Sequence, residues 1–133
     1  MPAASSKAFA ATWVGHDVLV AVAPDGSPVG YAAATPLDGF LHLAELSVDP
    51  DHGRIGVGGA LVEAVAALAD RRGLPGVTLT TFRDIPFNAP FYARLGFVEQ
   101  PLSGASAALR ERFLAEIPPG TAVEARVLML RRL

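Results

Sequence analysis

Residues 53–59 read Gly-Arg-Ile-Gly-Val-Gly-Gly, and this glycine-rich turn stands between two segments with different hydrophobic patterns. Before the turn, residues 40–48 form a mostly apolar run that Asp49-Pro50-Asp51 ends. After it, apolar side chains recur every three or four residues, which is the spacing of one face of an α-helix. A glycine-rich turn that leads into a helix presents backbone N–H groups at the positive end of the helix dipole. The stretch therefore predicts a strand–turn–helix unit that binds an anionic group such as a phosphate.

The rest of the chain alternates between strand-like and helix-like segments. Turn residues at 24–28 and 37–39 separate three strands, which we expect at residues 18–22, 29–34 and 41–48. The later elements that we expect are a helix from about 56 to 72 ended by Gly73, a strand at 77–81, a short helix over 88–96, a strand from 97, a helix at 106–116 and a strand at 125–130. The pattern predicts an α/β fold with a mixed, partly antiparallel central sheet flanked by helices, and parallel pairing across the long helix.

Length and composition bound what the chain can do. Its 133 residues are the size of one domain, so we expect a single domain over residues 1–133. A hydrophobic content of 51% with 18% charged residues is typical of a packed globular core and argues against disorder. The net charge of −2 favours neither a nucleic-acid partner nor a membrane partner.

Several kinds of chemistry and location are disfavoured by the residues present. The chain has no cysteine, which excludes a disulfide framework, a thiolate nucleophile and a thiolate metal ligand. Its three histidines, His16, His42 and His52, are scattered and form no metal-binding motif. Apolar stretches are broken well short of the ~18 residues that a membrane span needs, and the start lacks the long apolar region of a signal peptide. We therefore expect a cytoplasmic protein without a metal.

The glycine turn by itself leaves several ligands open. A P-loop requires Lys followed by Ser or Thr after the last glycine, whereas Ala60 follows Gly59 here, so a nucleoside triphosphate site is poorly supported. A dinucleotide fold places an acidic residue at the end of a second strand, but Asp70 lies in the predicted helix. A glycine-rich helix entry that serves only close packing also remains compatible with this pattern.

A second motif narrows the choice. Residues 88–97, Asn-Ala-Pro-Phe-Tyr-Ala-Arg-Leu-Gly-Phe, follow a predicted strand, and together with the glycine turn they resemble the GNAT family of N-acetyltransferases. The family's turn reads Gln/Arg-x-x-Gly-x-Gly/Ala, and Gly56 and Gly58 match its last two defined positions. Gly53 stands where the family has Gln or Arg, and the adjacent Arg54 could supply that charge. The resemblance extends from about residue 18 to residue 97.

The resemblance implies an acyl-CoA N-acyltransferase-like fold with acetyl-coenzyme A (acetyl-CoA) as co-substrate. It places the pyrophosphate on the amides of the turn, that is, on Arg54, Ile55, Gly56, Val57, Gly58 and Gly59. The pantetheine arm would pair with the end of the preceding strand at Leu46, Ser47 and Val48 and would contact Asn88. The parallel strands 41–48 and 77–81 would diverge to admit the thioester. A primary amine of a small molecule or a protein would then attack the acetyl carbonyl directly.

Acetyl transfer requires two proton movements, and two residues are candidates for them. Glu45 lies in a mostly apolar strand that we expect to be buried on both faces, which would raise the pKa of its carboxyl group toward that of a useful base, acting directly or through water. Tyr92 lies four residues after Asn88 on the same helix face, and the resemblance places it near the thioester sulfur as an acid. The alternatives are that Glu45 faces a solvated edge, that Tyr92 is only a core aromatic, and that Asn88 is only a helix N-cap.

Other features are less decisive. His42 and Glu45 should point to opposite faces of a regular strand, so we expect no pair between them unless a bulge intervenes. The Arg83-Asp84 pair could line the acceptor pocket, although a charged pair in a loop is more often a surface feature.

Only about 15 residues precede the first expected strand, whereas the family usually has a strand and helices there that form much of the acceptor wall. Either a partner subunit of a homodimer would complete the wall, or the pocket would be open. Two functions remain: an acetyl-CoA-dependent N-acetyltransferase, or a non-catalytic acyl-CoA-binding sensor or assembly module of the same fold.

Overall fold

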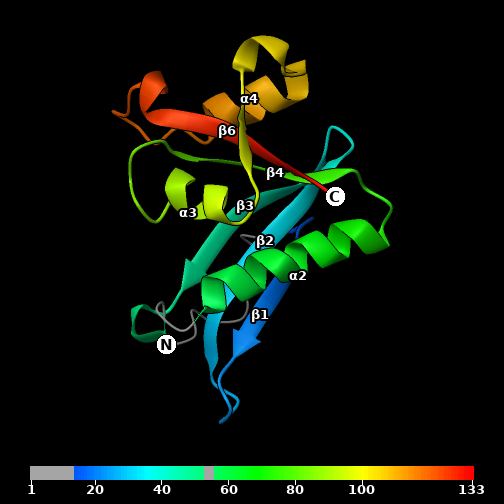
Figure 1. Ribbon diagram of the computed structural model, residues 1–133, viewed down its shortest axis with the longest axis vertical. Helices are drawn as coiled ribbons and strands as arrows, with labels where there is room; N and C mark the ends of the chain where they lie inside the picture. Colours follow the sequence, from blue (N-terminus) through cyan, green and yellow to red (C-terminus); the bar gives the residue numbers. More distant parts are fainter. Residues whose placement is uncertain (1–13, 53–55) are drawn as a thin grey trace.

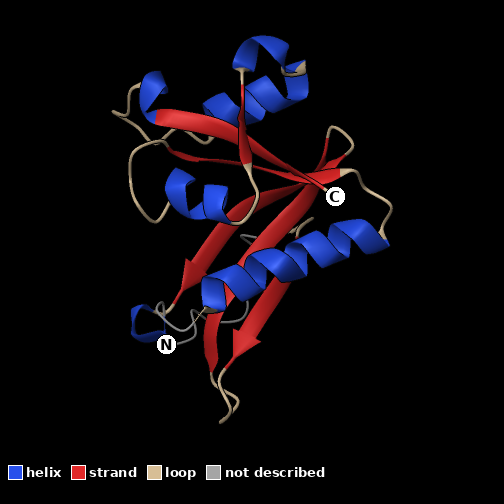
Figure 2. Cartoon of the chain, viewed as in Figure 1, coloured by secondary structure: helices blue, strands red, loops and turns tan. Residues whose placement is uncertain are grey.

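The computed structural model describes residues 14–52 and 56–133, and in these ranges the chain forms one sheet with helices on both faces (Figures 1 and 2). The strands are β1 (Asp17–Val22), β2 (Pro28–Leu37), β3 (Phe40–Val48), β4 (Gly76–Phe82), β5 (Val98–Gln100) and β6 (Arg126–Arg132). The helices are α2 (Val57–Arg71), α3 (Ala89–Arg94) and α4 (Ala107–Ala115), with short 3-10 turns at Pro50–His52, Leu102–Gly104 and Val123–Ala125. None of the helices in the described ranges is long and apolar enough to cross a membrane.

The sheet has the order β1-β2-β3-β4-β6-β5. The pairs β1–β2, β2–β3, β4–β6 and β6–β5 are antiparallel, and only β3–β4 is parallel among the described strands. A parallel pair needs a long crossover connection, and α2 provides it. The prediction of a mixed, partly antiparallel sheet with parallel pairing across the long helix is therefore confirmed.

Local sequence explains the ends of several elements. The β2–β3 hairpin turns at Asp38 and Gly39, whose φ values of 52° and 81° are the positive pair that a tight hairpin turn requires. Helix α2 ends where Gly73 adopts a φ of +69°, a conformation that favours glycine. Helix α4 begins after Ser106, whose Oγ accepts a hydrogen bond from the backbone N–H of Leu109 at 3.2 Å.

Two apolar clusters, one on each face, join the helices to the sheet. Helix α2 buries its apolar face, including Val62 and Val65, against the sheet in the main core. On the opposite face, Leu109 and Phe113 of α4 pack against Leu128 of β6 in a smaller cluster. Because side chains alternate along a strand, β6 contributes Leu128 to the α4 face and its neighbours to the α2 face. The sheet thus separates an α2 face from an α4 face.

The parallel pair opens soon after it begins. The β3–β4 ladder contains only the pairs Leu41–Val77 and His42–Thr78, after which the strands diverge. In Figure 1 the two strands start together near the C-terminus and separate toward α3. The divergence leaves the later part of β3 without β4 along one edge, and it creates the gap in which the candidate site lies.

A bulge in β3 changes which side chains share a face. Glu45 pairs with Ala33 of β2, and the next pair in the ladder joins Leu43 to the residue after Ala33. Ala44 is therefore an extra residue between two consecutive pairs. The bulge brings His42 and Glu45 to the same face of the sheet, the α4 face. The expectation that the two side chains point to opposite faces is wrong, because that expectation assumes a regular strand.

Candidate active site

The start of α2 has the features of an anion-binding site. Gly56 stands at the N-cap position with a φ of 81°, and no side chain caps this end of the helix. The first turn carries no acidic residue, so the positive end of the helix dipole is not neutralised there by a side chain within the described residues. The predicted contacts at Arg54 and Ile55 lie outside the described residues, as does Gly53.

A cavity of about 470 Å³ opens directly in front of this helix start. It is lined by Leu46, Val48, Pro50, Gly56, Gly58, Gly59, Phe87, Asn88, Phe91 and Tyr92. A Cβ added at Gly58 would lie 3.4 Å from the Phe91 ring and 3.7 Å from Val48, which are ordinary contacts. Packing of the protein itself therefore does not demand glycine at this position. The missing side chain instead leaves backbone accessible from the cavity, as a bound phosphate group requires.

The gap between the two diverging strands forms a second cavity, of about 320 Å³. Its lining comprises Leu43, Ala44, Glu45, Leu46, Leu79, Thr80, Thr81, Phe82, Asn88, Tyr92, Glu116 and Arg126. Leu46, Asn88 and Tyr92 also line the cavity at the start of α2. The two cavities are therefore neighbours, and together they run from the glycine turn into the gap between β3 and β4.

The last residues of β3 form one wall of this path. Leu46, Ser47 and Val48 pair with β2 on one side. Their other edge lies beyond the end of the β3–β4 ladder. Backbone N–H and C=O groups on that edge can pair with amide groups of an extended ligand, as in strand addition.

Glu45 stands in the gap but is not buried as expected. Its side chain is exposed, because β4 turns away at this point and leaves the α4 face of β3 open. Partial burial nevertheless raises the pKa of the Glu45 carboxyl group, and the charge of Glu116 raises it further, against a hydrogen bond from the Leu46 backbone that lowers it. The expected direction of the pKa shift is confirmed, although full burial is not its cause.

Tyr92 is both a core aromatic and a cavity-lining residue. Only 9% of its surface is exposed, and its ring makes edge contacts with Phe91 and Phe97 at centroid distances of 5.1 and 5.7 Å. Burial and the nearby charge of Glu45 raise the pKa of Tyr92 to about 12. The hydroxyl group is therefore protonated at neutral pH and is available as a hydrogen-bond donor in the gap.

Asn88 holds the N-cap position of α3 without capping it. No side-chain capping bond forms, and its Nδ2 instead donates to Thr81 Oγ1 at 2.8 Å. The interpretation of Asn88 as a capping side chain is wrong, because Thr81 at the end of β4 lies within reach of the amide. The bond holds the amide between the two cavities that Asn88 lines.

A hydrogen-bonded cluster of His42, Thr78, Thr80 and Glu116 lies beside the gap and was not predicted from the sequence. His42 is fully buried, and its Nε2 lies 3.1 and 3.0 Å from the two carboxylate oxygens of Glu116. Its Nδ1 lies 2.9 Å from Thr78 Oγ1, and the Thr80 hydroxyl donates to Glu116 Oε1 at 2.5 Å. Residues 42 and 116 are far apart in sequence, so no local pattern links them. The one available signal is an acidic residue at the C-terminal end of α4, where the helix dipole disfavours it.

Other candidates lie outside the gap. Arg83 donates to both carboxylate oxygens of Glu99 at 2.9 Å, and both side chains are exposed. Arg83 does not line the gap, so for this residue the surface interpretation holds. Within residues 14–52 and 56–133, no three His, Cys, Asp or Glu side chains are grouped as they would be to hold a metal ion.

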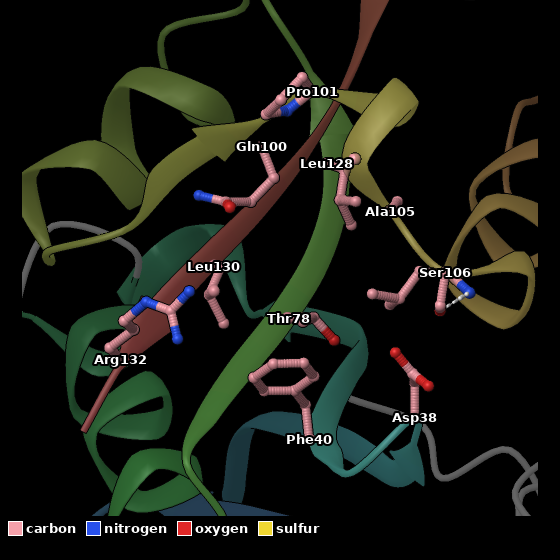
Figure 3. Close-up of a pocket in the computed structure, with 12 residues that line it drawn as sticks. Asp38, Phe40, Thr78, Gln100, Pro101, Ala105, Ser106, Leu128, Leu130 and Arg132 are labelled. Atoms are coloured by element: carbon pink, nitrogen blue, oxygen red, sulfur yellow. Dashed lines mark hydrogen bonds between the residues drawn. The ribbon is translucent and has the colours of Figure 1, made fainter.

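A third cavity, of about 470 Å³, lies on the α4 face, away from the glycine turn (Figure 3). Phe40, Leu128 and Leu130 form apolar parts of its wall, with Asp38 and Arg132 at its polar parts. Thr78 lines this cavity from β4. Because Thr78 also contacts His42, the buried imidazole stands between this cavity and the gap.

The fold is shared with solved acetyltransferases. An acetyltransferase of the GNAT family from Staphylococcus aureus superposes with a TM-score of 0.71 at 18% identity, covering 96% of this chain and 75% of that one. A Mycobacterium tuberculosis protein in complex with CoA gives a TM-score of 0.70 at 24% identity, with 95% and 81% covered. PaiA N-acetyltransferase from Thermoplasma acidophilum, in complex with coenzyme A, gives 0.65 at 16% identity, with 95% and 66% covered. At these identities the likeness establishes the acyl-CoA N-acyltransferase fold.

The sequence itself establishes the family. The family model described as "Acetyltransferase (GNAT) family" matches residues 4–97, which is more than half of the chain. The chain therefore belongs to the GNAT acetyltransferase family, as the glycine turn and residues 88–97 predicted.

Proposed function

We propose that the protein is an N-acetyltransferase that moves an acetyl group from acetyl-CoA to a primary amine of a small molecule or a protein. The observation that carries the proposal is the path of two neighbouring cavities from the uncapped start of α2 to the gap where Glu45 and Tyr92 stand. Family membership and the CoA complexes of two solved relatives support the co-substrate.

The residues along the path suit the parts of the co-substrate. Gly56, Gly58 and the first amides of α2 suit the pyrophosphate, because they combine backbone donors with the positive dipole end. The open edge of residues 46–48 suits the amides of the pantetheine arm, and Asn88 lies beside it. Acetyl-CoA supplies the acetyl group as a thioester, which these contacts would direct into the gap.

Glu45 and Tyr92 are suited to the two proton movements. The amine nitrogen forms a bond to the acetyl carbonyl carbon as the carbon–sulfur bond breaks. Glu45, with its raised pKa, takes the proton that the amine loses, directly or through water. The Tyr92 hydroxyl, protonated at neutral pH, donates toward the leaving sulfur. Transfer of the proton from Glu45 to the Tyr92 oxygen, directly or through water, restores both residues, so the neutral amine and the thioester give the amide and the thiol.

A thiol-release assay tests the proposal. The purified protein is incubated with acetyl-CoA and a panel of primary amines, and free thiol and acetylated product are measured. We expect turnover with at least one amine, and losses of about a hundredfold in kcat for Glu45→Gln and Tyr92→Phe. Glu99→Gln is the matched control, because this exposed carboxylate pairs with Arg83 outside the gap.

The same assay separates the second candidate function. Binding of acetyl-CoA without turnover on any amine, and without an effect of Glu45→Gln or Tyr92→Phe, would identify a non-catalytic acyl-CoA-binding module. Absence of any thermal shift with acetyl-CoA would contradict both functions.

A further inference from the structure

We propose that Glu116 binds the acceptor, holding its amine as an ammonium ion at the α4 side of the gap, and that His42 is a positioning residue that orients the Glu116 carboxylate. The acceptor class is accordingly a basic primary amine that arrives protonated and releases this additional proton to solvent before its nitrogen attacks. This inference rests on the proposed function and adds a binding residue from outside the two sequence motifs.

The Glu116 carboxylate is held from both strands that border the gap. His42 of β3 contacts both of its oxygens, at 3.0 and 3.1 Å, and Thr80 of β4 donates to Oε1. The side chain of Glu116 keeps 21% of its surface exposed and lines the gap cavity. The carboxylate is thus fixed in direction by protein donors while one side of it remains open to the cavity.

His42 is placed to orient the carboxylate and not to react. Its side chain is fully buried, so an acceptor in the gap cannot reach the imidazole without displacing Glu116. Because an ionised carboxylate only accepts hydrogen bonds, His42 Nε2 donates to Glu116, while Nδ1 forms a hydrogen bond with the Thr78 hydroxyl. The resulting chain Thr78–His42–Glu116 fixes the orientation of the ring and, through it, of the carboxylate.

The negative charge of Glu116 lies at a position that costs free energy, which a purely structural role does not explain. It follows the last residue of α4, where the helix dipole disfavours a negative charge. Burial alone raises the pKa of Glu116, but the hydrogen bond and charge of His42, the Thr80 hydroxyl and the charge of Arg112 together lower it below its ordinary value. Apolar side chains join helix to sheet at no such cost. A carboxylate kept ionised and open to a cavity is instead suited to bind a cation.

The gap lining holds two carboxylates against one guanidinium, so its balance of charge favours a cation. Glu45 on β3 adds a second carboxylate to the lining. Arg126 on β6 also lines the gap, where its Nη2 donates to Thr80 Oγ1 at 3.1 Å and to the Glu116 carbonyl oxygen at 3.3 Å, and its Nε is buried without a hydrogen-bond partner among the described residues. Its guanidinium also lies 4.6 Å from the centroid of the Phe82 ring. Arg112 on α4 reaches Glu116 Oε2 only at 3.9 Å, so that oxygen keeps capacity for another donor.

Steady-state kinetics with saturating acetyl-CoA test the assignment, with n-butylamine and 1,4-diaminobutane as the amines. We expect Glu116→Gln to raise the KM for the amine about ten- to hundredfold, as for loss of a charged hydrogen-bond partner, with a much smaller change in kcat. The KM for acetyl-CoA should not change. Glu111→Gln is the matched control, because it makes the same substitution at an exposed position of α4.

Two variants of His42 test the positioning role. His42→Gln keeps an N–H donor for Glu116, whereas His42→Leu removes it. We expect the amine KM to rise more for the leucine variant than for the glutamine variant, with the acetyl-CoA KM unchanged in both. Thermal unfolding identifies any variant that fails to fold, and Glu116→Gln, which preserves shape, then decides alone.

A second measurement does not depend on turnover. The imidazole signals of His42 are followed by NMR in the CoA-loaded protein while n-butylammonium chloride is added. We expect saturable shifts in the wild type and at least tenfold weaker binding in Glu116→Gln, in line with about 1.4 kcal/mol per factor of ten. If the wild type binds the amine but turns over none, the proposed function fails while the Glu116 assignment stands. An unchanged amine KM in Glu116→Gln, or the absence of His42 shifts in the wild type, overturns the assignment.

Discussion

Asn88 and Thr81 connect the beginning of α3 to the end of β4 through one hydrogen bond, from Asn88 Nδ2 to Thr81 Oγ1 at 2.8 Å. Thr81 is only 3% exposed, so the bond is largely shielded from water. It holds the Asn88 amide at the point where the cavity at the start of α2 meets the gap.

The first prediction concerns this bond. Asn88→Ala and Thr81→Val should each lower the free energy of unfolding by about 1 kcal/mol, because each removes one partner of a shielded hydrogen bond. The double variant should lose little more than either single variant, since the bond can be lost only once. Urea unfolding of the four proteins measures the coupling, and fully additive losses would contradict it.

The second prediction separates two glycines of the turn. Gly56→Ala should lower the free energy of unfolding by about 1–2 kcal/mol, because Gly56 has a φ of +81° that an L-residue adopts only with strain. Gly58→Ala should leave the unfolding free energy unchanged or slightly higher, since its Cβ would make ordinary contacts only and alanine favours a helix.

Gly58→Ala should affect the binding of acetyl-CoA, although it has little effect on the free energy of unfolding. The stabilisation of the Gly58→Ala protein by acetyl-CoA in thermal unfolding should be clearly smaller than that of the wild type, because the new methyl group would stand at the wall of the cavity where the coenzyme approaches the backbone. An unchanged acetyl-CoA shift would show that the coenzyme does not approach this backbone.

The third prediction concerns Tyr92. Its pKa of about 12 means that the hydroxyl stays protonated well beyond pH 10, so titration of the folded protein followed by tyrosinate absorbance should show one group ionising near pH 12. Because the folded pKa is raised, the contribution of Tyr92 to stability is complete below its unfolded pKa near 10 and is lost as the pH rises through 12. The step in tyrosinate absorbance near pH 12 should be missing in Tyr92→Phe. The signal that remains in this variant comes from Tyr31, and the wild type shows both groups.

The fourth prediction concerns the acid side of the pH profile. Because the pKa of Glu45 is raised, its carboxylate becomes protonated at a higher pH than that of an ordinary glutamate. As the pH is lowered, kcat/KM should therefore fall at this raised pKa. Ionisation of a group with a raised folded pKa costs stability as the pH rises. Glu45→Gln should therefore be at least as stable as the wild type at neutral pH, while its activity falls and its acid limb disappears. A Glu45→Gln protein that is less stable at pH 7 would contradict this reading.

Much of the fold follows from local signals in the sequence. The Asp38-Gly39 turn, the glycine at 56 before α2 and the glycine at 73 after it all stand where the predicted elements change. Such signals can be read because the preference of glycine for positive φ acts within a few residues. The two motifs that indicate the family are likewise continuous stretches, and both lie within the residues that the family model matches.

The candidate site was predictable only where it lies on those motifs. Tyr92 and Asn88 could be placed near each other, because they are four residues apart in one helix. The sequence left Glu45 open between a buried strand and a solvated edge, because its exposure depends on the divergence of β4 from β3. Likewise, the capping interpretation of Asn88 is wrong because Thr81, in another element, competes for its amide.

The sequence alone determined the order of the strands and helices along the chain, the glycine-rich start of α2 and the membership of the GNAT family. Only the tertiary structure decided that Ala44 forms a bulge, that His42 and Glu45 share the α4 face, and that Glu116 forms a hydrogen bond with His42 beside the gap. The physical reason is the separation in sequence of the residues that interact. Backbone preferences are encoded by neighbours in the chain, whereas register, strand divergence and the pairing of residues 42 and 116 depend on how the whole sheet packs.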